Sequence, residues 1–287
     1  MGRSSVFSTA LGKVVVIGGP TASGKSALAS QLALEKNGMI LNGDSLQVYA
    51  GLEILTDQPS LQAQREIPHR LYGFVDPTQN FSVGLWLSSV LKEIEESLQR
   101  GHLPIVVGGT GLYLKTLLQG ITPVPSLDPQ IRKELQERGY TQEALYRELQ
   151  TVDEVWSTHI HPHDRQRTLR GLEVYYGTGI PLSEWQAKKP TPFPYDFETI
   201  LVMPSKEDLR AKIAERIEKI VEKGVLEEIS AVLPLPPSPT ALKAIGLREF
   251  GAFIKGECSL EQAKELTFIH TCQYAKRQRT WFRHQFT

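Results

Sequence analysis

The sequence predicts an α/β protein: a P-loop NTPase-like parallel sheet flanked by helices, with an inserted all-helical lobe. Three observations carry this prediction. A glycine-rich loop at residues 19–26 lies between an apolar run and a segment of helical periodicity. Strand and helix patterns then alternate to about residue 119, which is the rhythm of a parallel sheet. From there to about residue 196, helical periodicity continues without a strand candidate.

The glycine-rich loop follows an apolar strand expected at residues 14–17 and precedes a helix expected from residue 26. It consists of Gly19, Pro20, Thr21, Ala22, Ser23, Gly24, Lys25 and Ser26. The backbone N–H groups of such a turn, with the positive end of the next helix, form a cavity for two linked phosphates. Lys25 adds a positive charge, and Ser26 offers a ligand for Mg²⁺. The fixed spacing argues against an ordinary strand-to-helix turn.

Polar residues follow two further expected strands, at residues 39–41 and 103–107, where a parallel sheet opens its ligand crevice. Asp44 suits either a general base or a helix N-cap, and its position does not decide between them. Gly108, Gly109 and Gly111 permit close backbone approach around Thr110, although spacing alone favours a turn with a threonine cap. Because no acidic residue ends the 103–107 strand, transfer to an acceptor is favoured over coupled hydrolysis.

The expected domains are a discontinuous core, residues 1–124 and 196–287, and a helical insertion, residues 125–195. A helix is expected at residues 83–99 and another from residue 110. In the insertion, His159, His161 and His163 could suggest metal binding, but a loop leading to a helix capped by Asp164 is favoured. Three arginines follow on that helix, as either a solvated face or a clamp for a phosphate backbone: Arg165, Arg167 and Arg170.

The carboxyl-terminal part of the core is expected to hold a strand at residues 199–203, helical periodicity over 206–230 and one or two helices over 260–287. This last segment interleaves bases and aromatics: Lys276, Arg277, Arg279 and Arg283 with Tyr274, Trp281, Phe282 and Phe286. Base stacking with phosphate contact and docking of an amphipathic helix on the core are equally compatible with that pattern.

Composition sets limits on partners and location. Lys+Arg and Asp+Glu both number 32, so a nucleic acid would have to bind a local patch. Cys258 and Cys272 offer neither a disulfide framework nor a zinc site, which suits a reducing cytoplasm. No apolar stretch approaches the roughly 20 residues that cross a bilayer. Since no continuous apolar core precedes Lys13, we expect no secretory signal and a cytoplasmic protein.

Taken together, these segments resemble the tRNA dimethylallyltransferases. The resemblance runs through most of the chain, in motifs that follow one another in the family's order: residues 19–26, 44–49, 68–71, 108–113, 161–167, 172–175, 244–246 and 276–282. It departs at residues 54–59, where Leu55 replaces the family's usual glycine and Gln58 a later lysine. The geometry of that loop is therefore left open.

The resemblance implies that the glycine-rich loop holds the diphosphate of dimethylallyl diphosphate with Mg²⁺, bound through Ser26. Lys25, Thr110 and Arg216 would stabilise the pyrophosphate leaving group, and Asp44 would take a proton from N6 of a flipped-out adenosine beside the anticodon. Contacts with tRNA are implied for Asp44, Ser45, Leu46, Gln47, Thr110, Arg132, Gln166, Arg167, Thr168, Leu169, Arg170, Lys243, Ala244, Ile245, Gly246, Leu247 and Arg248. A monomer is expected.

Three rival functions stay open from the sequence. An adenylate dimethylallyltransferase would perform the same chemistry on a free nucleotide, but it gives no reason for a helical lobe with an arginine helix. A small-molecule kinase would place ATP in the loop and leaves the basic C-terminal segment unexplained. A non-catalytic RNA-binding protein would not need Lys25, Ser26 and Asp44 intact.

Overall fold

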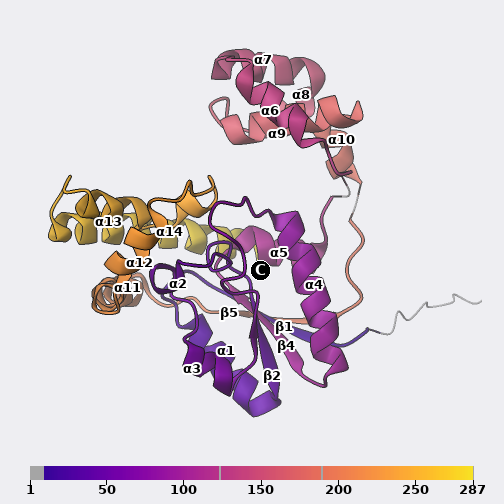
Figure 1. Cartoon of the computed structure of the whole chain (residues 1–287). Coiled ribbons are helices and arrows are strands. Elements are labelled where there is room, and N and C mark those ends of the chain that lie inside the picture. The colour runs from indigo at the N-terminus through magenta and orange to yellow at the C-terminus, as the bar shows by residue number, and fades with distance from the viewer. Residues whose placement is uncertain (1–9, 123, 189, 287) are drawn as a thin grey trace, which may run out of the picture. The chain divides into compact units, whose positions relative to one another are not determined.

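The computed structural model describes residues 10–122, 124–188 and 190–286 (Figure 1). The expectation about a secretory signal rests on the first residues, of which 1–9 lie outside this description. The chain forms two compact units. The core unit holds the described residues up to 118 and from 193 onward, and the helical unit holds residues 119–192.

The core unit is built on a five-stranded parallel sheet. In chain order the strands are β1 (Lys13–Gly18), β2 (Gly38–Asn42), β3 (His69–Arg70), β4 (Leu103–Gly108) and β5 (Asp196–Leu201), and their order in the sheet is β3-β2-β4-β1-β5. The predictions at residues 14–17, 39–41 and 103–107 are confirmed. β5 begins earlier than expected because it pairs with β1 from Lys13 and Asp196 onward. As a partly exposed edge strand it carries a weak apolar pattern.

Helices cover both faces of the sheet, as a doubly wound fold requires (Figure 1). Alternate residues of β1 divide between the two layers. Val15 and Ile17 pack with Ala29 and Ala33 of α1 (Lys25–Lys36). Val14 and Val16 pack on the other face with residues of α4 (Val83–Gln99) and α5 (Gly111–Gln119). The fold class predicted from the sequence is confirmed.

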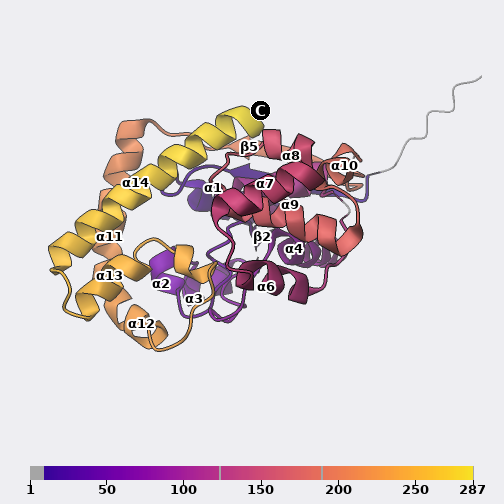
Figure 2. The same ribbon diagram turned by 90° about the horizontal axis from the view of Figure 1, so that it is seen from above.

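The remaining helices of the core unit, other than α3 (Leu61–Glu66), share a further apolar cluster. They are α2 (Glu53–Thr56), α11 (Lys206–Glu222), α12 (Val225–Val232), the 3-10 helix η1 (Ala241–Lys243), α13 (Leu247–Ile254) and α14 (Leu260–Gln285). The helical periodicity expected over residues 206–230 is confirmed, and it divides into two helices because Gly224, with a positive φ of 92°, separates α11 from α12. α14 runs as one helix beside α11 and α13 (Figure 2).

α14 docks on the sheet core through its aromatic residues. Phe282 is fully buried, Trp281 and Phe286 pack around it, and all three join the cluster beneath α4 and α5. The docking interpretation is therefore confirmed for these aromatics. Among the described residues no helix, α14 included, is both long and apolar enough to span a membrane.

The helical unit contains α6 (Pro129–Glu137), α7 (Gln142–Val152), α8 (Glu154–Thr158), α9 (Arg165–Thr178) and α10 (Leu182–Ala187). Its own apolar core includes Leu135, Leu145, Leu149 and Leu172. Its limits lie before the boundaries that the proline clusters suggested. α5 ends at Gln119, and the chain rejoins the core unit by Phe193, which packs on the sheet cluster with Tyr195. Proline clusters indicate a stiff backbone, but the boundaries of the units follow from which residues pack together.

We predict that Phe282→Ala lowers the free energy of unfolding by about 3–5 kcal/mol, because it leaves a cavity under the sheet. Leu266→Ala on the same helix is the matched control: Leu266 is 44% exposed, and its loss should cost no more than about 0.5 kcal/mol. Urea unfolding of both variants measures the difference. Equal midpoints would show that α14 does not depend on Phe282 for docking.

Candidate active site

The site lies at the carboxyl edge of the sheet, in a cavity of about 520 Å³ within the core unit. The loops that follow β1 and β2 reach it, and β4 lies between these strands in the sheet. The lining comes from the phosphate loop, Asp44 and nearby residues, α2, α11, the segment before α13 and α14: residues 21–26, 44, 46, 47, 55–57, 212, 213, 215–217, 219, 220, 223, 244, 245, 267, 271 and 274. This is the crevice position expected for a doubly wound sheet.

The phosphate loop has the backbone geometry that its sequence predicts. Ala22 and Gly24 have positive φ angles of 59° and 89°, and α1 begins directly after Gly24. No side chain among the described residues caps α1 there, so its first N–H groups are available to a ligand. Such a terminus is an anion-binding site.

Lys25 lies inside this loop, with its Nζ donating to the Pro20 carbonyl at 3.1 Å. Burial lowers the pKa of Lys25 to about 8, the Asp44 carboxylate opposes that shift, and the nearby Arg216 adds to it. The loop therefore holds a lysine whose charge is poorly compensated by the protein alone. A bound anion would supply the missing compensation.

Asp44 lies in a loop beyond β2 and does not start a helix, so its interpretation as a helix N-cap is wrong. Its Oδ1 accepts a hydrogen bond from the Leu46 N–H at 3.0 Å, and its own N–H donates to Oδ1 of the buried Asn42 at 2.8 Å. These bonds fix the carboxylate in the cavity wall. Within the described part of the chain, Oδ2 has no hydrogen-bond donor, so this oxygen is available to a substrate proton.

Two glycines bring the loops after β2 and β4 into backbone contact. A Cβ on Gly108 would lie 2.0 Å from the Gly43 carbonyl oxygen, while the Gly43 N–H donates to Val107 at 2.8 Å. Thr110 completes the junction: its Oγ1 accepts from the Ser45 N–H at 2.9 Å and lies 3.1 Å from the Ser45 hydroxyl. The threonine cap favoured by spacing is wrong, because the side chain bonds across to the Asp44 loop.

α14 contributes two site residues that the local sequence pattern did not assign. Gln278 is buried; its Oε1 accepts from the Thr21 N–H at 2.9 Å, and its Nε2 donates to the Gly109 carbonyl at 2.8 Å. Tyr274 lines the cavity close to Thr110 and Gln278. Burial, with the Asp44 charge as a smaller cause, raises the pKa of Tyr274, so its hydroxyl stays neutral.

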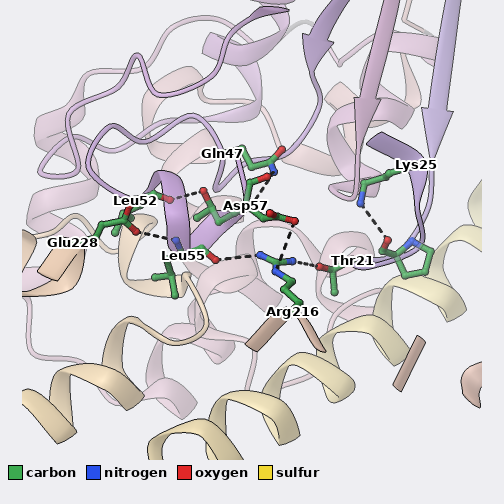
Figure 3. Close-up of polar contacts among 10 residues, drawn as sticks. Thr21, Lys25, Gln47, Leu52, Leu55, Asp57, Arg216 and Glu228 are labelled. Atoms are coloured by element: carbon green, nitrogen blue, oxygen red, sulfur yellow. Dashed lines mark hydrogen bonds and ion pairs between the residues drawn. The ribbon is translucent and has the colours of Figure 1, made fainter. Parts of the chain in front are cut away.

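The segment that departs from the family pattern forms the short helix α2, which holds Arg216 (Figure 3). The Arg216 guanidinium donates from Nη2 to the Leu55 carbonyl at 3.1 Å and from Nη1 to the Thr21 hydroxyl at 2.7 Å. Its Nε lies 4.0 Å from the Asp57 carboxylate. Gln47 donates to the carbonyls of Thr56 and Asp57. Arg216 is thus connected to the phosphate loop, as its predicted role requires.

Comparison with known proteins identifies the family. The family model described as IPP transferase matches residues 47–285 of this chain. The chain belongs to the IPP transferase family. Relatives named tRNA dimethylallyltransferase include those of Bartonella tribocorum, 46% identical over 95% of this chain and 96% of its own, and Geobacter sulfurreducens, 44% identical over 94% and 89%.

Solved structures of IPP transferases share the fold. A eukaryotic dimethylallyltransferase acting on tRNA has a TM-score of 0.83 and 31% identity, over 94% of this chain and 69% of that one. The tRNA isopentenylpyrophosphate transferase of Bacillus halodurans has a TM-score of 0.68 and 32% identity, over 95% and 87%.

Residues that the resemblance to this family assigns to RNA contact divide by exposure. Arg132, Gln166, Arg167 and Arg170 are exposed on the helical unit, as are Lys243 and Arg248 on the core unit. Thr168, Leu169, Ala244 and Leu247 have buried side chains, and Gly246 is buried as well. Asp164 caps α9 by accepting from the Arg167 N–H at 3.0 Å, so the prediction that the histidine segment is a loop leading to a helix capped by Asp164 is confirmed. No metal-binding cluster of His, Cys, Asp or Glu occurs in the described ranges.

We predict that Lys25→Met raises the melting temperature of the ligand-free protein at pH 7. The folded pKa of about 8 lies below the usual lysine value of 10.5, so burying the charged form costs stability at pH 7, and this cost fades as the pH rises towards 10.5. Removing a cost of about 1 kcal/mol from the free energy of unfolding would raise the melting temperature by roughly 2–4 °C.

Thermal scans at several pH values provide the measurement, with the exposed Lys36→Met on the same helix as control. A melting temperature that falls in Lys25→Met, or a gain that grows with pH, would contradict the burial of an uncompensated charge.

Proposed function

We propose that this protein transfers a dimethylallyl group from dimethylallyl diphosphate to N6 of the adenosine 3′-adjacent to the anticodon in tRNA, and releases pyrophosphate. The observation that carries the proposal is one cavity lined by a phosphate loop and by a carboxylate with an open oxygen, Asp44 Oδ2. Family membership and the names of the relatives agree with it.

In this reaction the N6 amine attacks the allylic carbon that carries the diphosphate. The new C–N bond forms as the C–O bond breaks, and pyrophosphate leaves with the bonding electron pair. Asp44 Oδ2 takes the proton that N6 loses. Lys25, Arg216 and Thr110 stabilise the charge that builds on the leaving group, which is electrostatic preorganisation at a developing anion.

Mg²⁺ fits the donor set of this site. Ser26 lines the cavity beside Lys25, and Mg²⁺ is usually bound by one or two protein groups together with substrate phosphates. One hydroxyl plus diphosphate oxygens is such a set. When bound, the ion would neutralise part of the diphosphate charge and so favour its departure.

For RNA binding, we propose that the exposed basic residues of the helical unit hold the anticodon stem through its phosphates. These are Arg132, Arg167 and Arg170, with Gln166 beside them; Lys243 and Arg248 would add contacts from the core unit. The target adenine must leave its stack to reach Asp44, where Ser45, Leu46 and Gln47 would hold it. We further propose that the protein acts as a monomer in the cytoplasm, in keeping with its free cysteines, Cys258 and Cys272.

The deciding experiment supplies Mg²⁺ and dimethylallyl diphosphate together with unmodified tRNA or AMP. Mass spectrometry of the digested nucleosides should show a five-carbon addition on tRNA adenosine alone. Addition to AMP would favour the adenylate enzyme. No addition to either acceptor would remove the prenyl-transfer proposal and return attention to ATP and the kinase hypothesis.

We predict that Asp44→Asn reduces turnover at least about a hundredfold while tRNA binding is retained. General-base catalysis contributes about 10²–10⁴-fold, and asparagine can keep the hydrogen bond to Leu46 that shapes the loop. Single-turnover assays and filter binding separate these effects. Near-normal turnover would remove the general-base role.

We predict that Arg167→Ala weakens tRNA binding several-fold and lowers the slope of log affinity against log salt by about one. Arg100→Ala is the control. Arg100 is also exposed and ion-paired within its helix, but it precedes β4 and so lies at the sheet edge opposite the site. Titrations at several salt concentrations should leave the control unchanged, and equal slopes for both variants would contradict the contact.

A further inference from the structure

α2 is a four-residue helix whose N-terminus is held by a carboxylate from a distant helix. Glu228 of α12 accepts from the Ile54 N–H at 2.7 Å with Oε2. It also accepts from the Leu55 N–H at 2.8 Å with Oε1 (Figure 3). These two N–H groups belong to the first turn, where intrahelical partners are missing. A four-residue helix has little stability of its own, so an external cap decides whether it forms.

The other end of α2 faces the cavity and fixes Arg216. The Leu55 residue that donates to Glu228 through its N–H accepts from Arg216 Nη2 through its carbonyl. Asp57, directly after the helix, lies 4.0 Å from Arg216 Nε. A displacement of α2 would therefore break the contacts of the Arg216 guanidinium with Leu55 and Asp57, while its contact with Thr21 remained.

Glu228 itself lies outside the cavity lining, which includes Leu55, Asp57 and Arg216. It is half-buried, and its carboxylate has the charge that makes hydrogen bonds from backbone N–H groups strong. Its path to the cavity thus runs through the backbone of α2: carboxylate to the Leu55 N–H, then the Leu55 carbonyl to Arg216.

We propose that Glu228 is a positioning residue of the transfer reaction, which acts through α2 to hold the Arg216 guanidinium where the diphosphate leaves. This inference rests on the proposed function for the reaction itself. The effect of Glu228 on Arg216 should also change the binding of pyrophosphate. It also gives a role to the segment that departs from the family pattern: Leu55 of α2 and Asp57, directly after it, supply the two groups of this segment that Arg216 contacts.

The test is a double-mutant cycle. Glu228→Gln keeps the size of the side chain but loses its charge, and Glu227→Gln removes a charge from the exposed neighbour on the same helix as control. Each change is also made in an Arg216→Ala background. Turnover, KM for dimethylallyl diphosphate, pyrophosphate affinity by calorimetry and melting temperature are measured for every variant.

In the wild-type background we expect Glu228→Gln to lower turnover and pyrophosphate affinity about tenfold, and Glu227→Gln to change neither by more than about twofold. In the Arg216→Ala background the additional effect of Glu228→Gln should vanish, since its route to the ligand is gone. A tenfold loss that persists without Arg216 would overturn the proposal, because the effect would then be general destabilisation. Equal behaviour of the Glu228 and Glu227 variants would overturn it too.

The inference and the proposed function can fail separately. An active wild-type protein with no coupling between Glu228 and Arg216 refutes the inference alone. A wild-type protein without prenyl transfer refutes the function, and the pyrophosphate affinities of the same cycle then decide on Glu228. If Glu228→Gln does not fold, Glu228→Asp replaces it, since it retains the charge but shortens the reach to α2.

Discussion

The site depends on the contact between the backbones of Gly43 and Gly108 at the carboxyl edge of the sheet. Any side chain at Gly108 would occupy the space of the Gly43 carbonyl, whose oxygen would be 2.0 Å from a Cβ. This contact places the loop that carries Asp44 beside the loop that carries Thr110. Without it, the Ser45–Thr110 hydrogen bonds could not form and the carboxylate would have no fixed distance to the phosphate loop.

A second constraint joins the two sides of the crevice. The Gln278 side chain accepts a hydrogen bond from the phosphate loop and donates one to the loop after β4. One buried amide therefore sets the spacing between the two loops. An amide suits this position because it presents an acceptor and a donor together. Leaving either backbone group buried and unpaired would cost about 1–3 kcal/mol. The hydrogen bonds that fix the position of the phosphate loop thus also contribute to the stability of the fold.

The features that the sequence could predict are those encoded by neighbouring residues. The phosphate loop, the central strands and α4 follow from local spacing and periodicity. The missed features depend on groups far apart in the chain. Glu228 caps a helix 174 residues away, and Gln278 bonds to Thr21 across 257 residues, so no local pattern signals either role. Thr110 was misjudged for the same reason, because its partner lies in another loop. Gly224 could have indicated the break between α11 and α12, since glycine is common where a helix ends.

α14 follows every other described element of the core unit along the chain, which matters while the protein is being made. N-terminal segments leave the ribosome first and can begin to pair, so β1, β2 and β4 become available long before residue 278. Until then the phosphate loop has no Gln278 to hold it, and the sheet face lacks Phe282. A growing chain therefore acquires its sheet before its active site. Translation that stops within α14 leaves a sheet with an unanchored phosphate loop and an exposed apolar face, a target for chaperones and proteases.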